Sequence, residues 1–396
     1  MKLFWPTMGT FEQAFENLAK EIPFEPFDAQ VLAFAHSLSK KLLTIRHLPE
    51  VVALGFWLRK AHIQEMKEAW KAETNGKVKK ARGTVFHIAP SNVDTIFIYS
   101  WILSLLAGNR NIIRISSKDQ SNELLDAIIE VLSRPEFESI GNRTIICTYS
   151  HDENYTEIIS NSCQTRVIWG GDETIRRIRQ VPLAPMANEL AFPDRFSLAA
   201  FNSDVVVQLD NQELSQLLEK FYNDVFWFNQ MACSSPRLII WTGENKEKAK
   251  NRFWSAFEKT IQSKQFELMA ASQVSKLTTS LWMASEAEVE SVQHRTYFSR
   301  VQMVDFPEAV RERHCGAGLF FEYDADSLRD LVSIIIDKDQ TLSYFGYEKE
   351  DLLSLVQAVS SRGIDQIVPI GQALDFHQVW DGQNFLTSFT REVVIN

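Results

Sequence analysis

The sequence is poor in residues that cross-link a chain or coordinate metals. Its 396 residues include four cysteines, Cys147, Cys163, Cys233 and Cys315, and no two of them have the spacing of a C-x-x-C metal knuckle. Disulfide frameworks belong to small secreted domains rather than to long acidic chains. We therefore expect no metal site and no disulfide, and each cysteine is taken as a small buried hydrophobe unless its surroundings indicate a reactive thiol.

Positive charge and long apolar runs are also scarce. The formal net charge is −10, and the basic residues form only short pieces such as residues 77–80, which does not suit a nucleic-acid surface. The longest apolar stretch, residues 95–108, is shorter than the roughly 20 residues needed to cross a bilayer. The first residues lack the apolar core of a signal peptide. We expect no nucleic-acid partner, no membrane span and a cytoplasmic location.

Neither of the common glycine-rich phosphate loops is present. The absence of G-x-G-x-x-G and G-x-x-x-x-G-K-[ST] argues against ordinary Rossmann dehydrogenases and P-loop enzymes. A weaker signal is the turn Gly170-Gly171-Asp172, where glycines permit close backbone approach and a helix N-terminus favours a phosphate. A plain strand-to-helix turn accounts for the same three residues equally well.

Hydrophobic periodicity divides the rest of the chain into helices and strands. Two amphipathic helices open it, one capped by Asp28 and one that follows Pro49 through Met66 and is ended by Gly76 and the charges around it. Apolar strands are then predicted at 85–88, 112–115, 144–147, 166–169, 237–241 and 319–321. Helices are predicted between them, over 119–132, 211–226, 245–262 and 326–336, and one begins at Asp172.

This alternation predicts an α/β fold with two doubly wound domains. We place the domain boundaries at 1–204, 205–365 and 366–396, with the last segment packing back on the core or on a partner subunit. Ligands of such folds bind where the carboxyl ends of strands meet, so we expect the active site in the cleft between the two domains.

Cys233 lies in the most specific segment of the chain, which runs from Phe226 to Arg237. A cysteine in a polar turn between a helix and a buried strand is placed to be exposed and reactive, because nearby backbone N–H groups favour a thiolate. The residues alone allow either a catalytic thiol or an ordinary buried cysteine.

Four segments, in order, resemble motifs of the aldehyde dehydrogenase superfamily. Phe228-Asn229-Gln230 followed by Cys233 resembles the F-N-Q-G-Q-x-C signature around its nucleophile, shortened by one residue. Residues 88–93 resemble the P-W-N-F-P motif, whose Asn helps to form the oxyanion hole. Residues 107–117 resemble the A-G-N-x-x-V-x-K-P-S-E strand that holds the adenosine ribose, and residues 168–172 resemble the F-T-G-S turn over the pyrophosphate.

The acyl-CoA reductases typified by the fatty-acid reductase subunit of bacterial luminescence (LuxC-type) are a closer match. Their Q-x-A-C-S-S-P-R segment is similar to residues 230–237, and their H-I-A-P-x-N strand to residues 87–92. Their C-terminal I-V-P-x-G-x-A-L-D-F and V-W-D-G stretches are similar to residues 367–376 and 379–382. The resemblance extends from about residue 50 to the end of the chain.

The resemblance implies an NAD(P)H-dependent acyl-CoA reductase and a set of site residues. Cys233 would be the nucleophile that an acyl thioester acylates, with Asn92 and the Cys233 backbone N–H stabilising the oxyanion. Hydride transfer would then release an aldehyde. Residues 1–204 would include the NAD(P)-binding domain, and 205–365 would be the catalytic domain. The implied cofactor-binding residues are Pro90, Arg114, Ser116, Ser117, Gly170, Gly171 and Asp172. His87, by contrast, is expected to be a packed core residue.

Two departures from the superfamily pattern refine the predicted reaction and cofactor. Hydrolytic aldehyde dehydrogenases carry a Glu in an upstream E-L-G-G motif, and the corresponding place here, near Ala199 and Ala200, has no carboxylate. An acyl-enzyme without that general base would be reduced rather than hydrolysed. Ser117 stands where the NAD-preferring pattern ends in Glu, and Arg114 and Lys118 flank it. Two cations and no acid favour the 2′-phosphate of NADPH, with NADH as the alternative if both cations are simply solvated.

Other functions remain open on sequence alone. An aldehyde-oxidising or acyl-phosphate-reducing dehydrogenase would share the nucleophile and differ in the acyl donor. A non-enzymatic fold relative acting as a scaffold would bind no cofactor. On the main hypothesis the donor is acyl-CoA or an acyl group on a carrier or protein, which leaves room for an acyl-transferring or acyl-activating partner enzyme. We also expect a homo-oligomer.

Overall fold

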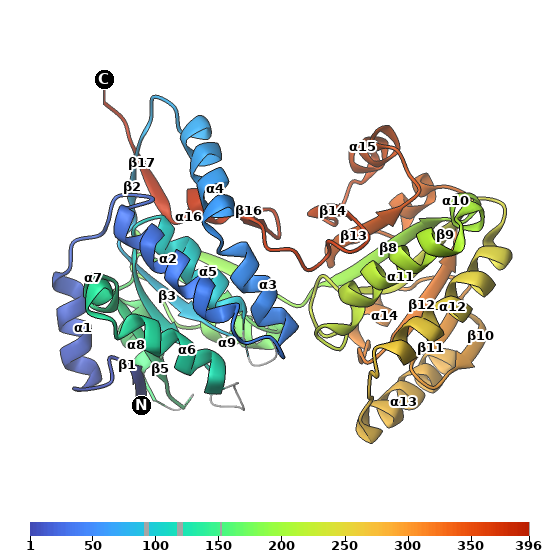
Figure 1. Cartoon of the computed structure of the whole chain (residues 1–396), viewed down its shortest axis with the longest axis horizontal. Helices are drawn as coiled ribbons and strands as arrows, with labels where there is room; N and C mark the ends of the chain where they lie inside the picture. The colour runs from blue at the N-terminus through green and yellow to red at the C-terminus, as the bar shows by residue number, and fades with distance from the viewer. Residues whose placement is uncertain (91–94, 117–121, 151–152, 396) are drawn as a thin grey trace. The chain divides into compact units, whose positions relative to one another are not determined.

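The computed structural model describes residues 1–90, 95–116, 122–150 and 153–395, and it divides the chain into two compact units (Figure 1). Unit 1 comprises Met1–Asp194 and Phe376–Asn396, and unit 2 comprises Arg195–Asp375. The boundaries placed from sequence, 204/205 and 365/366, both fall inside unit 2. They do so because strands β8 (Phe196–Asn202) and β14 (Gln366–Pro369) belong to the sheet of that unit.

Unit 1 is built around a six-stranded sheet of order β1-β5-β4-β3-β6-β7, in which only β1 runs antiparallel to its neighbour. Helices α1, α8 and α9 pack apolar side chains against one face, and α5 covers β3 and β4 on the other. The sheet strands are β1 (Lys2–Trp5), β3 (Thr84–Ile88), β4 (Arg110–Arg114), β5 (Thr144–Thr148), β6 (Thr165–Trp169) and β7 (Asn188–Phe192).

The helices of unit 1 are α1 (Phe11–Lys20), α2 (Ala29–Leu42), α3 (Pro49–Trp57), α4 (Lys60–Glu73), α5 (Ile96–Leu106), α6 (Asn122–Leu132), η1 (Pro135–Phe137), α7 (Glu138–Gly141), α8 (Tyr155–Ser160), α9 (Asp172–Arg179) and α16 (Phe385–Ser388). Two small antiparallel ladders complete the unit, β2 (Val78–Ala81) with β17 (Thr390–Val393) and β15 (Val379–Trp380) with β16 (Gln383–Asn384).

Unit 2 is built around a seven-stranded sheet of order β10-β11-β12-β9-β8-β13-β14, in which only β10 is antiparallel. Apolar side chains of α11 and α12 pack on one face, and those of α13, α14, η2 and α15 on the other. Its remaining strands are β9 (Pro236–Thr242), β10 (Val289–His294), β11 (Ser299–Met303), β12 (Leu319–Asp324) and β13 (Asp339–Phe345). Its helices are α10 (Ser203–Gln208), α11 (Asn211–Phe226), α12 (Lys246–Ser263), α13 (Ala270–Glu286), α14 (Ala309–Glu312), η2 (Leu328–Ser333) and α15 (Lys349–Ala358).

Both units therefore have the doubly wound α/β architecture predicted from the alternation of strands and helices. The predicted cap is also confirmed, since the Asp28 carboxylate accepts a hydrogen bond from the N–H of Gln30 at 2.8 Å. Within the described part of the chain, no helix is both long and apolar enough to cross a membrane.

Two predicted helices differ from the structure. The helix expected between Pro49 and Gly76 is two helices, α3 and α4, with extended backbone at Arg59. Leu58 and Ile63 are both buried, yet on one straight helix five residues would turn them about 140° apart, so the chain breaks between them. The helix expected over 326–336 is the shorter 3₁₀ helix η2 (Leu328–Ser333). There the Asp330 carboxylate accepts backbone hydrogen bonds from residues 326 and 327, which tightens the turn.

Asn109, the Asn of the A-G-N segment, joins three distant parts of unit 1. Its Oδ1 accepts a hydrogen bond from the Gly83 N–H at 3.0 Å, and its Nδ2 donates to the carbonyls of Phe389 at 3.0 Å and Ser104 at 3.2 Å. The C-terminal segment is held further by Phe385, whose ring stacks at 5.2 Å on that of Phe192. This segment thus packs on the core of unit 1.

His87 is fully buried on β3, as expected of a packed core histidine. Its Nδ1 lies 2.8 Å from the Ser100 hydroxyl and its Nε2 lies 3.0 Å from Asn111 Oδ1. Asn111 Nδ2 donates to the Asn109 carbonyl, so Asn111 Oδ1 is an acceptor and His87 donates from Nε2. Burial lowers the pKa of His87 to about 4, which keeps the ring neutral.

This burial predicts a pH dependence of the stability of unit 1. The folded pKa, about 4, lies below the ordinary value of 6.5, so the stabilisation is complete above pH 6.5 and is lost as the pH falls toward 4. Between pH 7 and pH 5 the loss should be about 2 kcal/mol. The measurement is urea unfolding at both pH values for wild type and His87→Gln, which should flatten the dependence. His47→Gln, at an exposed histidine, is the control; an equal flattening there would contradict the assignment.

Candidate active site

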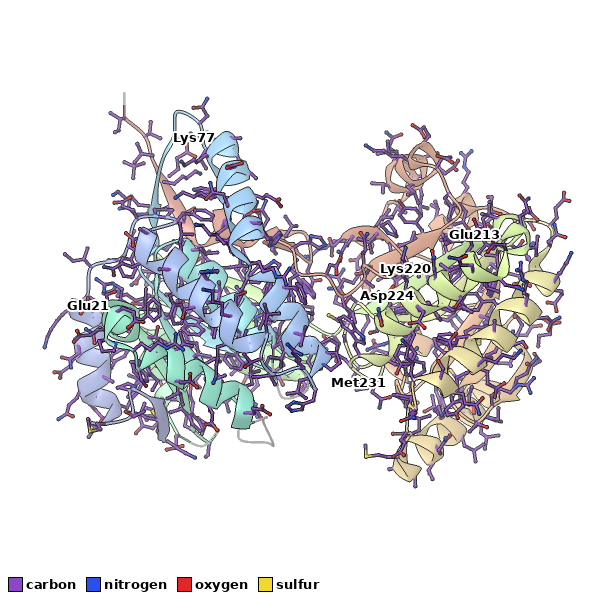
Figure 2. The ribbon with its side chains drawn as sticks, in the orientation of Figure 1. Glu21, Lys77, Glu213, Lys220, Asp224 and Met231 are labelled. Carbon is purple, nitrogen blue, oxygen red and sulfur yellow. The ribbon has the colours of Figure 1, made fainter. Side chains whose placement is uncertain are left out.

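Cys233 lies in the turn that connects α11 to β9 in unit 2, and it is half-buried. The backbone of the turn is unusual, because Asn229 and Gln230 both have positive φ, 50° and 61°. Two consecutive residues in the left-handed region reverse the chain sharply at the end of α11. Met231, which follows them, is 42% exposed (Figure 2), so the turn offers both apolar surface and a thiol to solvent.

Gln230 holds this turn in place. Its side chain is fully buried, and its Nε2 donates to the carbonyls of Pro236 at 2.9 Å and Leu319 at 3.0 Å. Its Oε1 accepts from the Gly318 N–H at 2.9 Å. We call residues 227–235, which connect α11 to β9, the thiol turn. Because Pro236 begins β9 and Leu319 begins β12, the Gln230 side-chain amide joins the thiol turn to the amino ends of two adjacent strands. The sequence motif includes Gln230 but does not predict this structural role.

The loop before β12 packs against the thiol turn. The Ala317 N–H donates to the Asn229 carbonyl at 2.9 Å. Gly316 has φ +68°, a conformation that favours glycine, and a Cβ there would lie 3.0 Å from the Asn229 carbonyl oxygen and 2.7 Å from Met231 Sδ. Gly318, with φ +79°, is similarly close to the Tyr297 carbonyl.

His314 lies at the start of the same loop and supports it. Its Nδ1 accepts from the Gly316 N–H at 2.9 Å, so its Nε2 donates to the Leu319 carbonyl at 2.8 Å. Burial and the nearby Arg237 guanidinium hold the pKa of His314 well below its ordinary value. The ring is a neutral structural element, with both nitrogens engaged by the backbone.

The strand beside Cys233, β8, carries a hydroxyl that binds the backbone of the nucleophile segment. Ser197 on β8 donates from Oγ to the Cys233 carbonyl at 2.6 Å and accepts from the Thr341 N–H at 3.2 Å. Ala199 and Ala200, further along β8, are fully buried in the two cores of unit 2. Ser197 was not identified from sequence, because nothing in a lone serine signals contact with a residue 36 positions away.

Glu189, a carboxylate upstream of that position, is committed to ion pairs in unit 1. It lies on β7 and binds Arg166 Nη2 at 2.5 Å and Arg179 Nε at 2.8 Å. The Arg166 side chain is itself buried, so loss of Glu189 would leave a buried charge without its partner. Glu189 is therefore a structural anion of unit 1.

The sequence-predicted cofactor residues meet at one edge of the unit 1 sheet. Arg114 ends β4, Pro90 and Ser116 follow β3 and β4, and Gly170-Gly171-Asp172 follow β6, so all lie at carboxyl ends of parallel strands. Asn92 and Ser117, as well as Lys118, lie outside the described residues. The roles of all these residues, and that of Cys233, stay predictions.

Arg114 has a cationic neighbour that sequence reasoning missed. Its guanidinium lies 5.0 Å from the Tyr149 ring centroid, and Nη2 donates to the Tyr149 carbonyl at 3.3 Å. Burial, with a further contribution from Arg177 on α9, lowers the pKa of Arg114. The positive charge of Arg177 thus acts on Arg114, which itself ends β4. Sequence gave no signal of it, because residues 114 and 177 meet only in the folded sheet.

The Gly170-Gly171 turn is less suited to a phosphate than its glycines suggest. A Cβ on Gly171 would lie 3.1 Å from the Asp194 carboxylate, and Asp172 and Glu173 begin α9. Arg176 pairs with both of these acids, at 4.0 and 3.3 Å. Asp172 would repel a phosphate through its side chain and could contribute only its backbone N–H.

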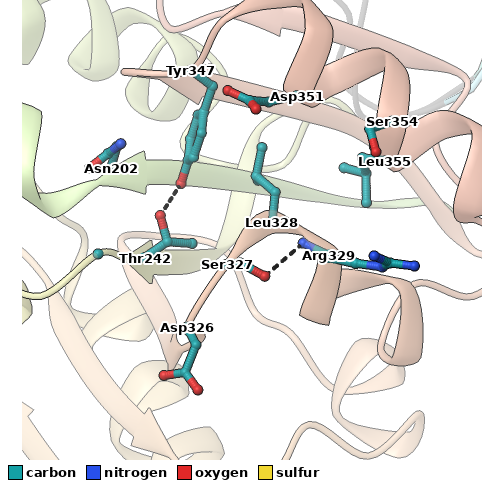
Figure 3. A pocket seen from close by; sticks show the side chains of 11 residues that line it. Asn202, Thr242, Asp326, Ser327, Leu328, Arg329, Tyr347, Asp351, Ser354 and Leu355 are labelled. Atoms are coloured by element: carbon teal, nitrogen blue, oxygen red, sulfur yellow. Dashed lines mark hydrogen bonds between the residues drawn. The ribbon is translucent and has the colours of Figure 1, made fainter.

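Unit 2 also has a surface hollow of about 330 Å³, shown in Figure 3. Asn202 and Thr242, the last residues of β8 and β9, line it together with Tyr347, whose hydroxyl lies 2.7 Å from Thr242 Oγ1. Cys233 precedes β9, so the hollow lies at the opposite edge of the sheet, about 20 Å away along a seven-residue strand. It is therefore separate from the thiol turn.

Asp224 on α11 fixes the C-terminal end of unit 2 (Figure 2). Its carboxylate accepts hydrogen bonds from the N–H groups of Gly371 at 2.6 Å and Ala373 at 3.1 Å. Burial raises the pKa of Asp224 to about 7 in spite of these bonds. The Gly and Ala of the I-V-P-x-G-x-A-L-D-F stretch thus have a structural role.

Within the described residues, no cluster of three or more histidine, cysteine or acidic side chains could hold a metal ion.

The two doubly wound units have an aldehyde-dehydrogenase-like fold. Staphylococcus aureus AldH in a substrate-bound state is similar, with 16% identity and a TM-score of 0.64 over 97% of this chain and 93% of that chain. Glyceraldehyde-3-phosphate dehydrogenase GapN from Methanocaldococcus jannaschii complexed with NADP shows 11% identity and a TM-score of 0.65, over 96% and 92%. At these identities the likeness establishes the fold, and the predicted fold class is confirmed.

Residues 63–392 match the family described as Acyl-CoA reductase (LuxC), and the chain belongs to that family. The resemblance drawn from the sequence motifs is thereby confirmed. A long-chain acyl-protein thioester reductase of Aliivibrio fischeri is 25% identical over 170 residues. The match spans 41% of this chain and 33% of that protein, so it covers about a third of the relative.

From the three hydrogen bonds of the Gln230 side chain we predict that Gln230→Ala will make the thiol turn less rigid. The change leaves the Gly318 N–H and two carbonyls buried without this hydrogen-bond partner, which should lower the free energy of unfolding by about 2–4 kcal/mol. It should also change the rate of Cys233 alkylation by iodoacetamide in the folded enzyme. Gln265→Ala is the matched control, because Gln265 also has positive φ, 54°, but is exposed. Equal effects of the two changes would remove Gln230 from the positioning of the thiol.

Proposed function

We propose that the chain reduces an acyl thioester to an aldehyde through an acyl group carried on Cys233, with NADPH as the hydride donor. The chain belongs to a family of acyl-CoA reductases, so it is an oxidoreductase that acts on acyl groups. The more specific proposal rests on one observation. Cys233 is half-buried on a turn that Gln230 holds in place, and it lies beside β8, which offers Ser197 and no carboxylate.

In the first half of the proposed reaction, the Cys233 thiolate attacks the carbonyl carbon of the acyl thioester. The oxyanion that forms is stabilised by the Cys233 backbone N–H and by Asn92. The Ser197 bond to the Cys233 carbonyl fixes the peptide that follows the nucleophile, which keeps the turn oriented toward the substrate. Collapse of the tetrahedral species breaks the carbon–sulfur bond to the donor, whose thiolate leaves and takes up a proton.

In the second half, the acyl carbon accepts a hydride and the Cys233 thiolate is expelled, which regenerates the enzyme and releases the aldehyde. Reduced nicotinamide supplies the two electrons of this step when bound. Arg114, which ends β4 at the carboxyl edge of the unit 1 sheet, supports binding of the adenosine end of that cofactor there, and the positive charge of Arg177 on α9 acts on the same region. The same pair supports NADPH over NADH, since its 2′-phosphate adds negative charge there.

The donor is proposed to be acyl-CoA or an acyl group on a carrier or protein. The Aliivibrio fischeri relative, named as an acyl-protein thioester reductase, supports the second possibility. A protein donor would call for an acyl-transferring or acyl-activating partner enzyme. The exposed Met231 beside the thiol turn suits an apolar acyl chain.

The missing carboxylate predicts a long-lived acyl-enzyme when the cofactor is withheld. Thioester hydrolysis without a positioned general base is slower by about 10²–10⁴-fold. Mixing the enzyme with an acyl-CoA should therefore leave one acyl group on Cys233 for minutes, detected by intact-mass spectrometry. Adding NADPH should discharge it as aldehyde in a single turnover.

Three variants complete this experiment. Cys233→Ala should form no adduct and show less than about a thousandth of wild-type turnover, since a lost nucleophile has no substitute. Cys315→Ala, at the other half-buried cysteine, should still be acylated. Rapid release of free acid without cofactor, abolished by Glu189→Gln, would instead identify an aldehyde-oxidising, hydrolytic enzyme.

Cofactor preference gives a separate prediction at Arg114. Arg114→Ala should raise the KM for NADPH about 10- to 150-fold more than the KM for NADH, the effect of losing one charge-assisted phosphate contact worth about 1.5–3 kcal/mol. Arg177→Ala should act in the same direction. Arg176→Ala is the control, because Arg176 is exposed on the same helix and pairs with Glu173. Equal weakening of both cofactors would place Arg114 near a part of the dinucleotide that they share.

A further inference from the structure

The four central strands of the unit 2 sheet are followed by connections that lie on opposite faces. After β8 and β9 the chain continues into α11 and α12, which pack on one face. After β12 and β13 it continues into η2 and α15, which pack on the other face. In the strand order β12-β9-β8-β13 the connections therefore diverge between β12 and β9 and again between β8 and β13. Open α/β sheets bind ligands in the crevice that forms at the carboxyl ends of such strands.

The hollow of about 330 Å³ shown in Figure 3 lies at this crevice. Its lining includes residues from the carboxyl ends of all four strands: Asn202 ends β8, Thr242 ends β9, residues 326–329 follow β12, and Tyr347 follows β13. Pockets for small molecules range from about 300 to 1,000 Å³, so this hollow is at the lower end of that range. Its size therefore suits a small molecule rather than a dinucleotide.

Two carboxylates fix the loops that form the walls of the hollow. Asp204 on α10 accepts hydrogen bonds from the N–H groups of Glu244 and Asn245, at 3.1 and 3.0 Å, and so holds the loop after β9. Asp330 on η2 accepts from the N–H groups of residues 326 and 327, at 3.0 and 2.9 Å, and so holds the loop after β12. Because these walls are fixed before a ligand enters, less conformational freedom is lost on binding.

The hydroxyls of Thr242 and Tyr347 supply hydrogen-bonding capacity to the hollow. Their oxygens lie 2.7 Å apart, and Thr242 is only 3% exposed. A hydroxyl can donate one hydrogen bond and accept others, so after bonding to each other the two still have one proton to donate and lone pairs to accept with. Burial raises the pKa of Tyr347, which therefore keeps its proton. The pair can both donate to and accept from a ligand, which matches the hydrogen-bonding needs of another hydroxyl.

The charged side chains around the hollow balance one another. Its lining includes the acids Asp326 and Asp351 and the base Arg329. Lys246, at the start of α12, places its Nζ 3.8 Å from Asp326 Oδ1 and so offsets the charge of that acid. An anionic ligand would be repelled by Asp351, and a cationic one by Arg329. The arrangement therefore favours a ligand without net charge.

The remaining lining combines apolar surface with further polar groups. Leu328 and Leu355, from η2 and α15, are 7% and 3% exposed and give the hollow apolar side chains. Ser354 adds a hydroxyl, and Asp351, which accepts from the Glu348 N–H at 3.2 Å, still has acceptor sites free on its carboxylate. A wholly apolar ligand would leave these polar groups without partners. A carbon skeleton that carries several hydroxyls satisfies both kinds of surface.

We propose that this hollow binds a small, neutral polyhydroxylated compound, a sugar or a cyclic polyol. Ligand hydroxyls donate to the Asp351 carboxylate and exchange hydrogen bonds with the Thr242 and Tyr347 pair, while the carbon skeleton packs on Leu328 and Leu355. The hollow is about 20 Å from the thiol turn along β9, so this ligand is distinct from the acyl donor. The proposal therefore does not depend on the function proposed for Cys233.

The test uses D-glucose, D-ribose and myo-inositol as probes of the full chain, each at millimolar concentration, in saturation-transfer difference NMR. At least one probe should receive saturation from the protein, and a titration then gives its Kd. Ser354→Trp should abolish the signal, because the indole fills the hollow from an exposed position of α15. Leu353→Trp is the matched control, since Leu353 is the preceding residue of α15, is 49% exposed and does not line the hollow. Circular dichroism of both variants should match wild type.

A second pair of variants tests the hydrogen bonds without filling the hollow. Asp351→Asn should raise the Kd of the bound probe about 10-fold, because a charge-assisted hydrogen bond is lost while the amide oxygen can still accept from Glu348. Glu350→Gln, at a neighbouring acid outside the lining, should leave the Kd unchanged. Inorganic phosphate and putrescine, as charged probes, should not displace the bound compound. The proposal is overturned if none of the three neutral probes receives saturation, if binding survives Ser354→Trp, if Asp351→Asn and Glu350→Gln act equally, or if a charged probe displaces the neutral one.

Discussion

The buried amide of Gln230 is the contact on which the geometry of the thiol turn depends. Its three hydrogen bonds reach Pro236, Gly318 and Leu319, and so tie the turn before β9 to the loop before β12. An unsatisfied amide in this place would be costly, so the turn, the loop and the amino ends of two strands form one unit. The left-handed backbone at Asn229 and Gln230, and the close approach of Gly316 to Met231, are consequences of that arrangement.

The chemistry proposed for Cys233 rests as much on its neighbours as on the thiol. Ser197 fixes the peptide after the nucleophile, and the strand that carries it continues into the buried pair Ala199 and Ala200. A carboxylate buried among those apolar side chains would pay a large desolvation penalty. His314, in the loop before β12, is neutral, and both of its ring nitrogens are bonded to the backbone. Strand β8, which lies beside the Cys233 turn, carries no carboxylate, and this supports the proposal that an acyl-enzyme is reduced.

Several motif residues that suggest function from sequence have structural roles instead. Asn109 joins Gly83, Ser104 and Phe389 within unit 1. Gly371 and Ala373 are held by the Asp224 carboxylate in unit 2. Except for the contact with Ser104, these contacts connect residues that are 26 to 280 positions apart, and they satisfy buried polar groups that would otherwise be unpaired. Resemblance to a family identifies such positions, but the contacts show what each of them does.

The sequence by itself determined the class of fold, most elements and the identity of the thiol turn, because these depend on local pattern. Alternating strands and helices, the Asp28 cap and the polar turn at Cys233 are all short-range features. Only the tertiary structure decided that residues 49–66 form two helices, that Arg177 lies near Arg114, and that the carboxyl ends of four strands of unit 2 line one hollow. The physical reason is that burial and charge proximity depend on which elements pack together, and hydrophobic spacing along one helix cannot say which face another element will cover.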